Sequence, residues 1–522
     1  MSHILETKPV QQLARIIEES TRSTQSGVKY FIEPAVGTLN RATTKRHHII
    51  FGRRGSGKSS LLYKLRSDFS LDRRATAYVD LEEFKGHSYP DVLISVLIKT
   101  LTEFKTWFDS TAIKSSSSKS WWQKLFGAAP TRTKLDTDQS GKISSEIADL
   151  IKELNEILHS GDEQKTSTTV KKSESTGYEG KGSIGFNTQV ASASAAASGS
   201  SKDEQTKEVQ QEYTSKKIES LHRNIIKYKA LFGSISSVSG GASYLLLDDF
   251  YHLRIADQAS VLDYFHRIAK GSNLWIKVGT IRHRSRWYIF GTPPVGMKLG
   301  DDAEQIDLDV TLEKYDTTKR FLVKILEGFS KEAALNLSDI ITDGARDRLV
   351  LASGGVARDF LTIFRRALDI ASERVLRADN SRGEKIGAED VNKASGENDT
   401  FKREDFTRDT GVEEQKTLLS LFENISDFCL TTITANCFLV DKDLSNKETR
   451  GIAELVDLKF LHHIKSRVTV REKSKRLYDA YMLDLSQYAG ERARRNFDIL
   501  EFWGAEAEDE LRRTKLIFLE RT

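Results

Sequence analysis

Residues 52–59 read Gly-Arg-Arg-Gly-Ser-Gly-Lys-Ser, and this segment limits the fold of the chain more than any other. It matches the pattern G-x-x-x-x-G-K-[ST] in full, in which glycines let the backbone curl so that its N–H groups point at phosphate oxygens. Residues 47–51 (His-His-Ile-Ile-Phe) precede the loop and read as a short buried strand, and leucines at helical spacing follow the loop. A strand before such a loop and a helix behind it, with its positive N-terminal end, complete a phosphate site. The segment therefore predicts an α/β core that binds a nucleotide.

Each position of this loop has an expected role. Lys58 is predicted to reach the β- and γ-phosphates, and the Ser59 hydroxyl is predicted to ligate Mg²⁺. The predicted phosphate-binding residues are Gly52, Arg53, Arg54, Gly55, Ser56, Gly57, Lys58, Ser59 and Ser60. The alternative is a chance glycine-rich turn, which the flanking strand and helix disfavour.

A second predicted strand ends in two carboxylates. Residues 244–249 read Tyr-Leu-Leu-Leu-Asp-Asp, which is an apolar strand followed by acids. Asp248 is predicted to bind Mg²⁺ through water, and Asp249 to polarise the attacking water. The alternative is an ordinary buried strand capped by acids.

Two more segments are expected near the same site. A strand at 274–281 includes Thr280 near its end and precedes Arg282 and Arg284. Because this end of a parallel sheet faces the nucleotide, Thr280 is predicted to contact the γ-phosphate or the water. One of the two arginines is predicted to reach the nucleotide of a neighbouring subunit, with a solvated basic loop as the alternative. Further on, residues 354–358 read Gly-Gly-Val-Ala-Arg, and Arg358 starts a helix with apolar spacing. Arg358 is predicted to sense the γ-phosphate from this helix.

Strands alternate with helices up to about residue 312, which predicts a parallel α/β sheet. Only helical patterns follow, up to about residue 395. The predicted divisions are an N-terminal helix at 1–24, the α/β core at 25–312, a helical lid at 313–395, a linker at 396–411, a small domain at 412–490 and a charged helical tail at 491–522.

The segment 110–205 differs in composition from the core around it. Residues 161–207 contain no Leu, Met or Trp, so they cannot bury enough apolar area to offset the entropy of ordering. We expect a low-complexity insertion with helical islands at 143–159 and 206–232. Its aromatic pair Trp121 and Trp122 is interpreted as packing on the core, with a protein-partner anchor or a membrane-interface anchor as alternatives.

The net charge of +4 over 522 residues excludes a polycation, so any nucleic-acid surface must be local. Two cysteines, Cys429 and Cys437, make no disulfide scaffold and suggest a reducing compartment. No apolar run approaches the ~20 residues that span a bilayer. These observations predict a cytoplasmic protein.

The order of these features resembles that of AAA+ ATPases, with residues 52–59 as Walker A, Asp248 and Asp249 as Walker B, Thr280 as sensor 1 and Arg358 as sensor 2. Residues 386–394 (Ile-Gly-Ala-Glu-Asp-Val-Asn-Lys-Ala) look like the segment that closes the lid in the origin-recognition (ORC-like) initiator branch. The resemblance implies ATP and Mg²⁺ as ligands. Signalling ATPases of the STAND class share most of these motifs. Many related ATPases have Glu where this chain has Asp249, which argues against fast hydrolysis.

In the ORC-like branch a winged-helix domain follows the lid, and residues 412–490 resemble one. A helical turn at 446–456 precedes a predicted β-ribbon with strands at 460–464 and 477–483. The basic residues of its tip are Arg467, Arg471, Lys473, Lys475 and Arg476. A basic wing can lie along the phosphate backbone or in a groove of duplex DNA. The alternative is a protein-docking domain with a solvated hairpin tip.

Two functions are therefore open. In the first, the chain is an ATP-hydrolysing protein that forms homo-oligomers through its ATP interface and engages duplex DNA through the wing. In the second, it is a slow nucleotide switch that signals to protein partners, and the 110–205 insertion provides a partner surface.

Overall fold

A computed structural model describes residues 4–21, 24, 26–117, 137–160, 191–377, 383–409, 412–443, 447–473, 475–490, 497–504 and 507–519. Trp121 and Trp122 lie outside these ranges. None of the helices within them combines the length and the apolar character that a bilayer crossing needs.

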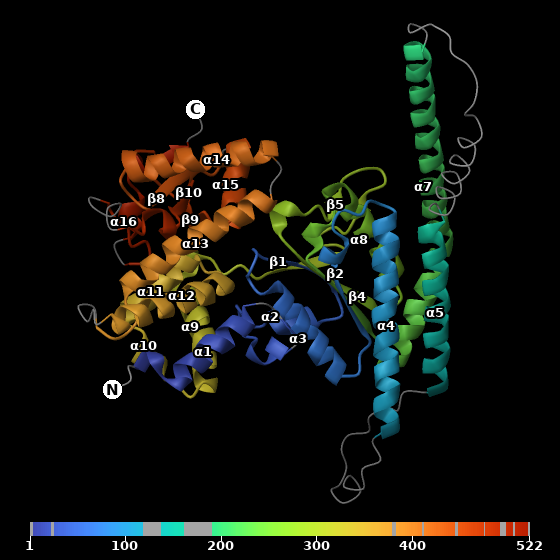
Figure 1. The fold of residues 1–522 in the computed structure, drawn as a ribbon, viewed down its shortest axis with the longest axis horizontal. Helices are drawn as coiled ribbons and strands as arrows, with labels where there is room; N and C mark the ends of the chain where they lie inside the picture. Colours follow the sequence, from blue (N-terminus) through green and yellow to red (C-terminus); the bar gives the residue numbers. More distant parts are fainter. Residues whose placement is uncertain are drawn as a thin grey trace, which may run out of the picture.

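Five parallel strands form the central sheet, in the order β2-β3-β4-β1-β7 (Figure 1). Their bounds are β1 His47–Phe51, β2 Thr76–Asp80, β3 Ser243–Asp248, β4 Leu274–Thr280 and β7 Ala303–Asp307. Strands β1 and β3 are buried along their whole length. Burial on both faces explains why residues 49–51 of β1 and 245–247 of β3 are consecutive apolar residues rather than an alternating pattern. The predicted parallel α/β sheet is confirmed.

Helices cover both faces of this sheet. Leu245 and Leu247 of β3 pack among α4, α5, α7 and α8, whereas Tyr244 and Leu246 pack against α3. This division follows from the pleat, which points successive side chains to opposite faces. The helices are α2 Thr38–Thr43, α3 Lys58–Leu71, α4 Asp91–Ser117, α5 Thr137–His159, α7 Ala191–Val238 and α8 Ile255–Ala269. In Figure 1, α4, α5 and α7 lie beside the sheet as long helices, and α7 extends beyond the other two.

Short elements complete the core. They are η2 Ser26–Tyr30, η3 Leu81–Phe84, η5 Phe250–His252, η6 Arg282–Arg284, β5 Tyr288–Ile289, β6 Val295–Gly296 and η7 Leu312–Lys314. Of these, η3 follows β2 and η5 follows β3, so both lie at the carboxyl edge of the sheet. A further short helix, η1 Ile4–Glu6, buries Leu5 in the hydrophobic cluster of the helical lid.

A helical lid follows the core. Its helices are α9 Tyr315–Glu332, α10 Leu337–Ile340, α11 Asp343–Ser353, α12 Ala357–Leu376 and α13 Ala388–Asp409. The N-terminal helix α1, Lys8–Ser20, packs against α9 and α12. Its apolar stripe of Val10, Leu13 and Ile17 is buried in the same hydrophobic cluster as the lid. In the structure, α1 is therefore a structural part of the lid.

The C-terminal domain has the helices and the β-ribbon of a winged helix, as the sequence predicts. Its sheet has the order β11-β8-β10-β9. The elements are α14 Val412–Asp427, η9 Phe428–Thr432, β8 Cys437–Asp441, α15 Lys447–Asp457, β9 Leu461–Val468, η10 Arg471–Lys473, β10 Tyr478–Leu483, η11 Leu485–Tyr488, α16 Ala507–Leu511, η12 Thr514–Leu516 and β11 Ile517–Leu519. Cys429 and Cys437 are buried free thiols.

Two expectations from the sequence are corrected. The polar segment 396–411 was expected to be a linker, but its residues up to Asp409 continue helix α13. The tail 491–522 was expected to be helical, but its residues Ile517–Leu519 form β11, which pairs in parallel with β8. Strand β11 forms because Ile517 and its neighbours complete the edge of a sheet, a tertiary contact that outweighs local helix propensity.

The winged-helix domain docks on the lid through buried groups. The imidazole of His462 lies against Gly354, and its Nε2 lies 2.7 Å from Oδ2 of Asp484. Lys402 donates from Nζ to the same oxygen at 2.8 Å. On the core side, the Arg53 guanidinium donates to the carbonyl of Gly354 at 3.0 Å. Gly354 is therefore the point where the phosphate-binding loop, the lid and the winged helix meet.

Gly354→Ala is expected to lower the free energy of unfolding by about 1–3 kcal/mol, as overpacking in a filled core does. Gly354 has a φ of +55°, and an added Cβ would lie 2.0 Å from the ring of His462. Gly344→Ala is the control, because a Cβ there meets no atom within 4 Å. Urea unfolding of both variants measures the effect, and equal midpoints would contradict this account of the interface.

Candidate functional site

A cavity of about 840 Å³ lies between the phosphate-binding loop, the N-terminal segment and the lid. Residues 54–60, seven of the nine predicted phosphate-binding residues, line it, namely Arg54, Gly55, Ser56, Gly57, Lys58, Ser59 and Ser60. Asp248 and Asp249 line the same cavity, although about 190 residues separate them from the loop. The structure thus brings the two predicted motifs together.

The loop has the backbone that its glycines allow. Gly55 and Gly57 have φ values of +88° and +99°, in the left-handed region where other residues are strained. Helix α3 begins at Lys58, so its free N–H groups and positive end face the cavity. The buried Lys58 amine donates to the carbonyls of Gly52 at 2.8 Å and Arg53 at 3.1 Å. Burial lowers the pKa of Lys58, while Asp249 and Asp248 act in the opposite direction.

Asp248 is buried at the end of β3 and accepts a hydrogen bond from the hydroxyl of Tyr78 at 2.7 Å. Burial, followed by the charge of Asp249, raises the pKa of Asp248 to about 6, against the effect of hydrogen bonds from Ser59 and Tyr78. On the neighbouring strand, a Cβ at Gly279 would lie 2.9 Å from Oδ1 of Asp248. Any larger residue at Gly279 would therefore press on this carboxylate, a role that the sequence analysis missed.

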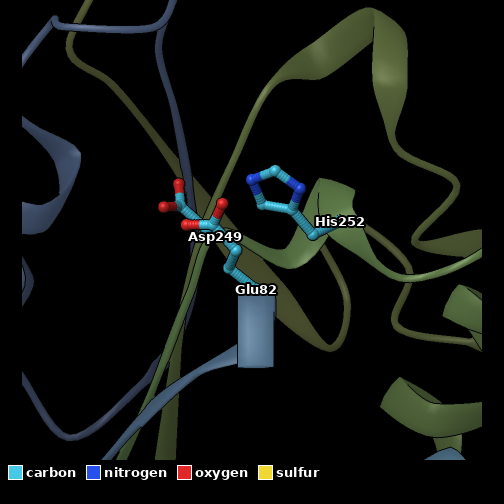
Figure 2. Close-up of side chains that lie close together, drawn as sticks. All are labelled: Glu82, Asp249 and His252. Carbon is cyan, nitrogen blue, oxygen red and sulfur yellow. The ribbon is translucent and has the colours of Figure 1, made fainter. Parts of the chain in front are cut away.

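Asp249 lies next to two residues that the sequence analysis did not identify. Potential ligand atoms of Glu82, Asp249 and His252 all lie within 4.8 Å of one another, and all three residues line the cavity (Figure 2). Burial lowers the pKa of His252, partly offset by Asp249 and Glu82. Glu82 follows a buried strand, and this position in the sequence could have identified it as a candidate site residue.

The remaining two loop residues do not line the cavity. The guanidinium of Arg53 turns to the lid side, where Nε lies 3.3 Å from Oδ1 of Asp309 and Nη2 donates to Gly354. Gly52 lines a second, smaller cavity of about 220 Å³, together with Arg53, His463 and Asp457 of the winged-helix domain. Burial raises the pKa of Asp457 to about 7.

The predicted sensor and finger residues have different positions. Arg358 lines the main cavity at the start of α12, and its Nε donates to the carbonyl of Thr21 at 3.1 Å. Thr280 is buried, and its hydroxyl contacts that of Ser285. The guanidinium of Arg282 stacks on Phe51, 3.8 Å from the ring centroid. Neither Thr280 nor Arg282 is among the residues that line the main cavity, and Arg284 is not among them either.

An apolar wall forms part of the cavity lining. Its members from the N-terminal segment and from α9 are Tyr30, Phe31, Ile32, Phe321, Ile325 and Phe329. Tyr30 and Phe329 join the two sides through an edge-to-face contact with ring centroids 4.8 Å apart. Such a wall suits a flat aromatic base. The sequence alone does not reveal this wall, because its two groups of residues lie about 290 positions apart and show only ordinary core spacing.

The basic wing lies in the C-terminal domain. Arg467, Arg471 and Lys475 are exposed, whereas Lys473 and Arg476 are partly buried. Arg471 pairs with Asp509 at 2.8 Å, and Arg476 lies 3.7 Å from Asp441. The charge of the wing is therefore partly neutralised within the chain.

No protein-family model and no curated protein matches the chain. Among solved structures, it is similar to the Orc1 protein of Aeropyrum pernix in complex with DNA, with 14% identity, 95% of this chain and 92% of that chain covered, and a TM-score of 0.34. It is also similar to Cdc6p from Pyrobaculum aerophilum, with 10% identity, coverages of 89% and 92%, and a TM-score of 0.31. At these identities and scores neither likeness bears on function.

Proposed function

We propose that the chain binds ATP with Mg²⁺ between its core and lid, hydrolyses it, and couples the nucleotide state to the engagement of duplex DNA. The observation that carries this proposal is the single cavity of about 840 Å³ that joins Lys58, Ser59 and Asp248 to an apolar wall. Phosphates would lie against the loop, and the base would lie against the wall.

The oxygen donors at the site fit Mg²⁺, which prefers carboxylate, hydroxyl and water ligands together with substrate phosphates. Ser59 would coordinate it directly, and Asp248 would hold it through water. Bound Mg²⁺ would neutralise the charge that develops on the phosphate oxygens. Lys58 would exchange its two carbonyl partners for phosphate oxygens, and Arg358 would contact the γ-phosphate from the lid. We also propose that Thr280 senses the γ-phosphate. Arg282 or Arg284 would reach the nucleotide of a second copy of the chain across an oligomer interface.

The contacts of Arg53 support a coupling to the winged helix. Arg53 belongs to the phosphate-binding loop, yet its side chain holds the carbonyl of Gly354, against which His462 of the winged-helix domain packs. A shift of the loop on binding phosphate would therefore reach the winged helix directly. The test is the ATP turnover rate of the purified protein with and without duplex DNA. A several-fold rise with DNA supports the coupling, whereas a rate indifferent to DNA contradicts it.

Arg467→Glu combined with Lys475→Glu is expected to weaken duplex binding and to lower the slope of log K against log salt by about 2, one for each phosphate contact. Both side chains are exposed on the wing. Fluorescence anisotropy with a labelled duplex across a salt series measures both quantities. The matched control is Lys45→Glu with Lys270→Glu, which makes the same charge change at exposed positions of the core. Equal losses in the two double variants would exclude the wing as the site.

One observation favours a second function, a slow ATP switch that signals to protein partners. Helix α7 extends beyond α4 and α5, away from the sheet and the lid (Figure 1). A projecting helix of this kind offers a surface that nucleotide hydrolysis does not need. Tight ATP binding with slow turnover that DNA does not change would favour the switch.

A further inference from the structure

Besides Asp80 and Asp248, two further carboxylate residues line the cavity, namely Glu82 and Asp249. Strands β2 and β3 pair in parallel with Asp80 opposite Asp248. Asp249 follows the end of β3 by one residue, and Glu82 follows the end of β2 by two. The register of the sheet therefore brings Glu82 and Asp249 to the same edge, from segments far apart in the chain.

The backbone holds Glu82 in this place. The carboxylate of Asp80 accepts a hydrogen bond from the N–H of Glu82 at 3.0 Å and so caps the short helix η3. Helix η3 packs against η5, which carries His252. The Glu82 side chain is exposed and lines the cavity, so a water molecule has access to its carboxylate.

The carboxylate of Asp249 is less able than that of Glu82 to extend into the cavity. Its φ of +50° is unusual for a residue other than glycine, and its N–H donates to Oδ1 of Asp248 at 2.9 Å. Its carbonyl accepts from the N–H of His252 at 3.0 Å. The backbone of Asp249 is thus held on both sides, and its side chain is one methylene shorter than that of Glu82. Figure 2 shows the two carboxylates close together with the imidazole of His252 beside them.

We propose that Glu82 is the general base of ATP hydrolysis, and that Asp249 and His252 orient the water that it activates. The proposal rests on the proposed function. The water oxygen forms a bond to the γ-phosphorus while the bond from that phosphorus to the β–γ bridging oxygen breaks. The electron pair of that bond leaves with ADP, and the proton of the water passes to the Glu82 carboxylate. Lys58 and Ser59 line the same cavity, so the base and the phosphate-binding groups share one space.

Glu82→Gln is expected to lower kcat at least about 100-fold, the usual range for loss of a general base, while ATP affinity stays unchanged. Glu83→Gln is the matched control, because Glu83 is the next residue, is exposed and pairs with Lys99 at 3.2 Å. It should keep the wild-type kcat. Asp249→Asn should retain more turnover than Glu82→Gln. Phosphate release gives kcat, and titration with a fluorescent ATP analogue gives affinity.

Three different results would overturn the proposal. If Glu82→Gln keeps the wild-type kcat while Asp249→Asn abolishes turnover, Asp249 is the base and ATP hydrolysis by this site still stands. If the wild type binds ATP but releases no more phosphate than Lys58→Ala, then hydrolysis itself fails and the role of Glu82 fails with it. A loss of ATP affinity in Glu82→Gln equal to its loss of turnover would make Glu82 a binding residue rather than a base.

Discussion

Lys58→Ala is expected to reduce ATP hydrolysis at least about 100-fold, the range for losing a preorganised charge at the reacting phosphate. The Lys58 amine is buried in the loop, held by the carbonyls of Gly52 and Arg53. It is therefore already positioned before phosphate arrives. Because the amine would contact both the β- and γ-phosphates, ATP affinity should fall as well as kcat. Phosphate release and ATP titration measure the two effects.

A lysine further along the same helix provides the control for Lys58→Ala. Lys64 lies in α3 and pairs with Asp68 at 2.7 Å. Lys64→Ala should leave both turnover and affinity within about a factor of two, because partly exposed ion pairs contribute only about 0–1 kcal/mol. If Lys58→Ala hydrolyses ATP as fast as Lys64→Ala does, the cavity is not the catalytic site and the proposed function fails.

Asp484→Ala is expected to lower the free energy of unfolding by about 3–5 kcal/mol, the cost of leaving buried charges without their partner. Asp484 is fully buried and binds Lys402 at 2.8 Å and His462 at 2.7 Å. Without it, Lys402 and His462 stay buried between the lid and the winged helix. Urea unfolding measures the loss. Asp443→Ala in the same domain is the control, since Asp443 is exposed and its loss should cost no more than about 0.5 kcal/mol.

The contribution of Asp484 should also depend on pH. Burial by itself raises the pKa of Asp484, but Lys402 and His462 outweigh it and hold the pKa below its usual range. A carboxyl with a lower pKa in the folded chain stabilises the fold above its unfolded pKa of about 3.9 and loses that effect as pH falls. The difference between wild type and Asp484→Ala should therefore shrink below about pH 4. A difference that is the same at pH 3 and pH 7 would contradict this assignment.

Local sequence patterns were sufficient to predict the secondary structure of much of the α/β core. The strand 47–51 is confirmed, and its consecutive apolar residues Ile49, Ile50 and Phe51 are typical of a strand buried on both faces. The loop that follows it lines the cavity, and its binding of phosphate stays a prediction. The prediction failed where a segment had no such pattern. Residues 396–409 are polar and were assigned to a linker, yet they continue α13 because residues such as Phe406 are buried against the lid and the winged helix.

The sequence by itself determined which residues form the proposed nucleotide site, since Lys58, Ser59, Asp248 and Asp249 stand in short segments at or after the ends of buried strands. Only the tertiary structure decided which other residues share their space. Glu82 and His252 lie beside Asp249, and Tyr30 lies against Phe329, because sheet order and register bring distant segments together. The physical reason is that the periodicity of apolar residues indicates which face of a helix or strand is buried. Which other elements pack against that face depends on the whole fold.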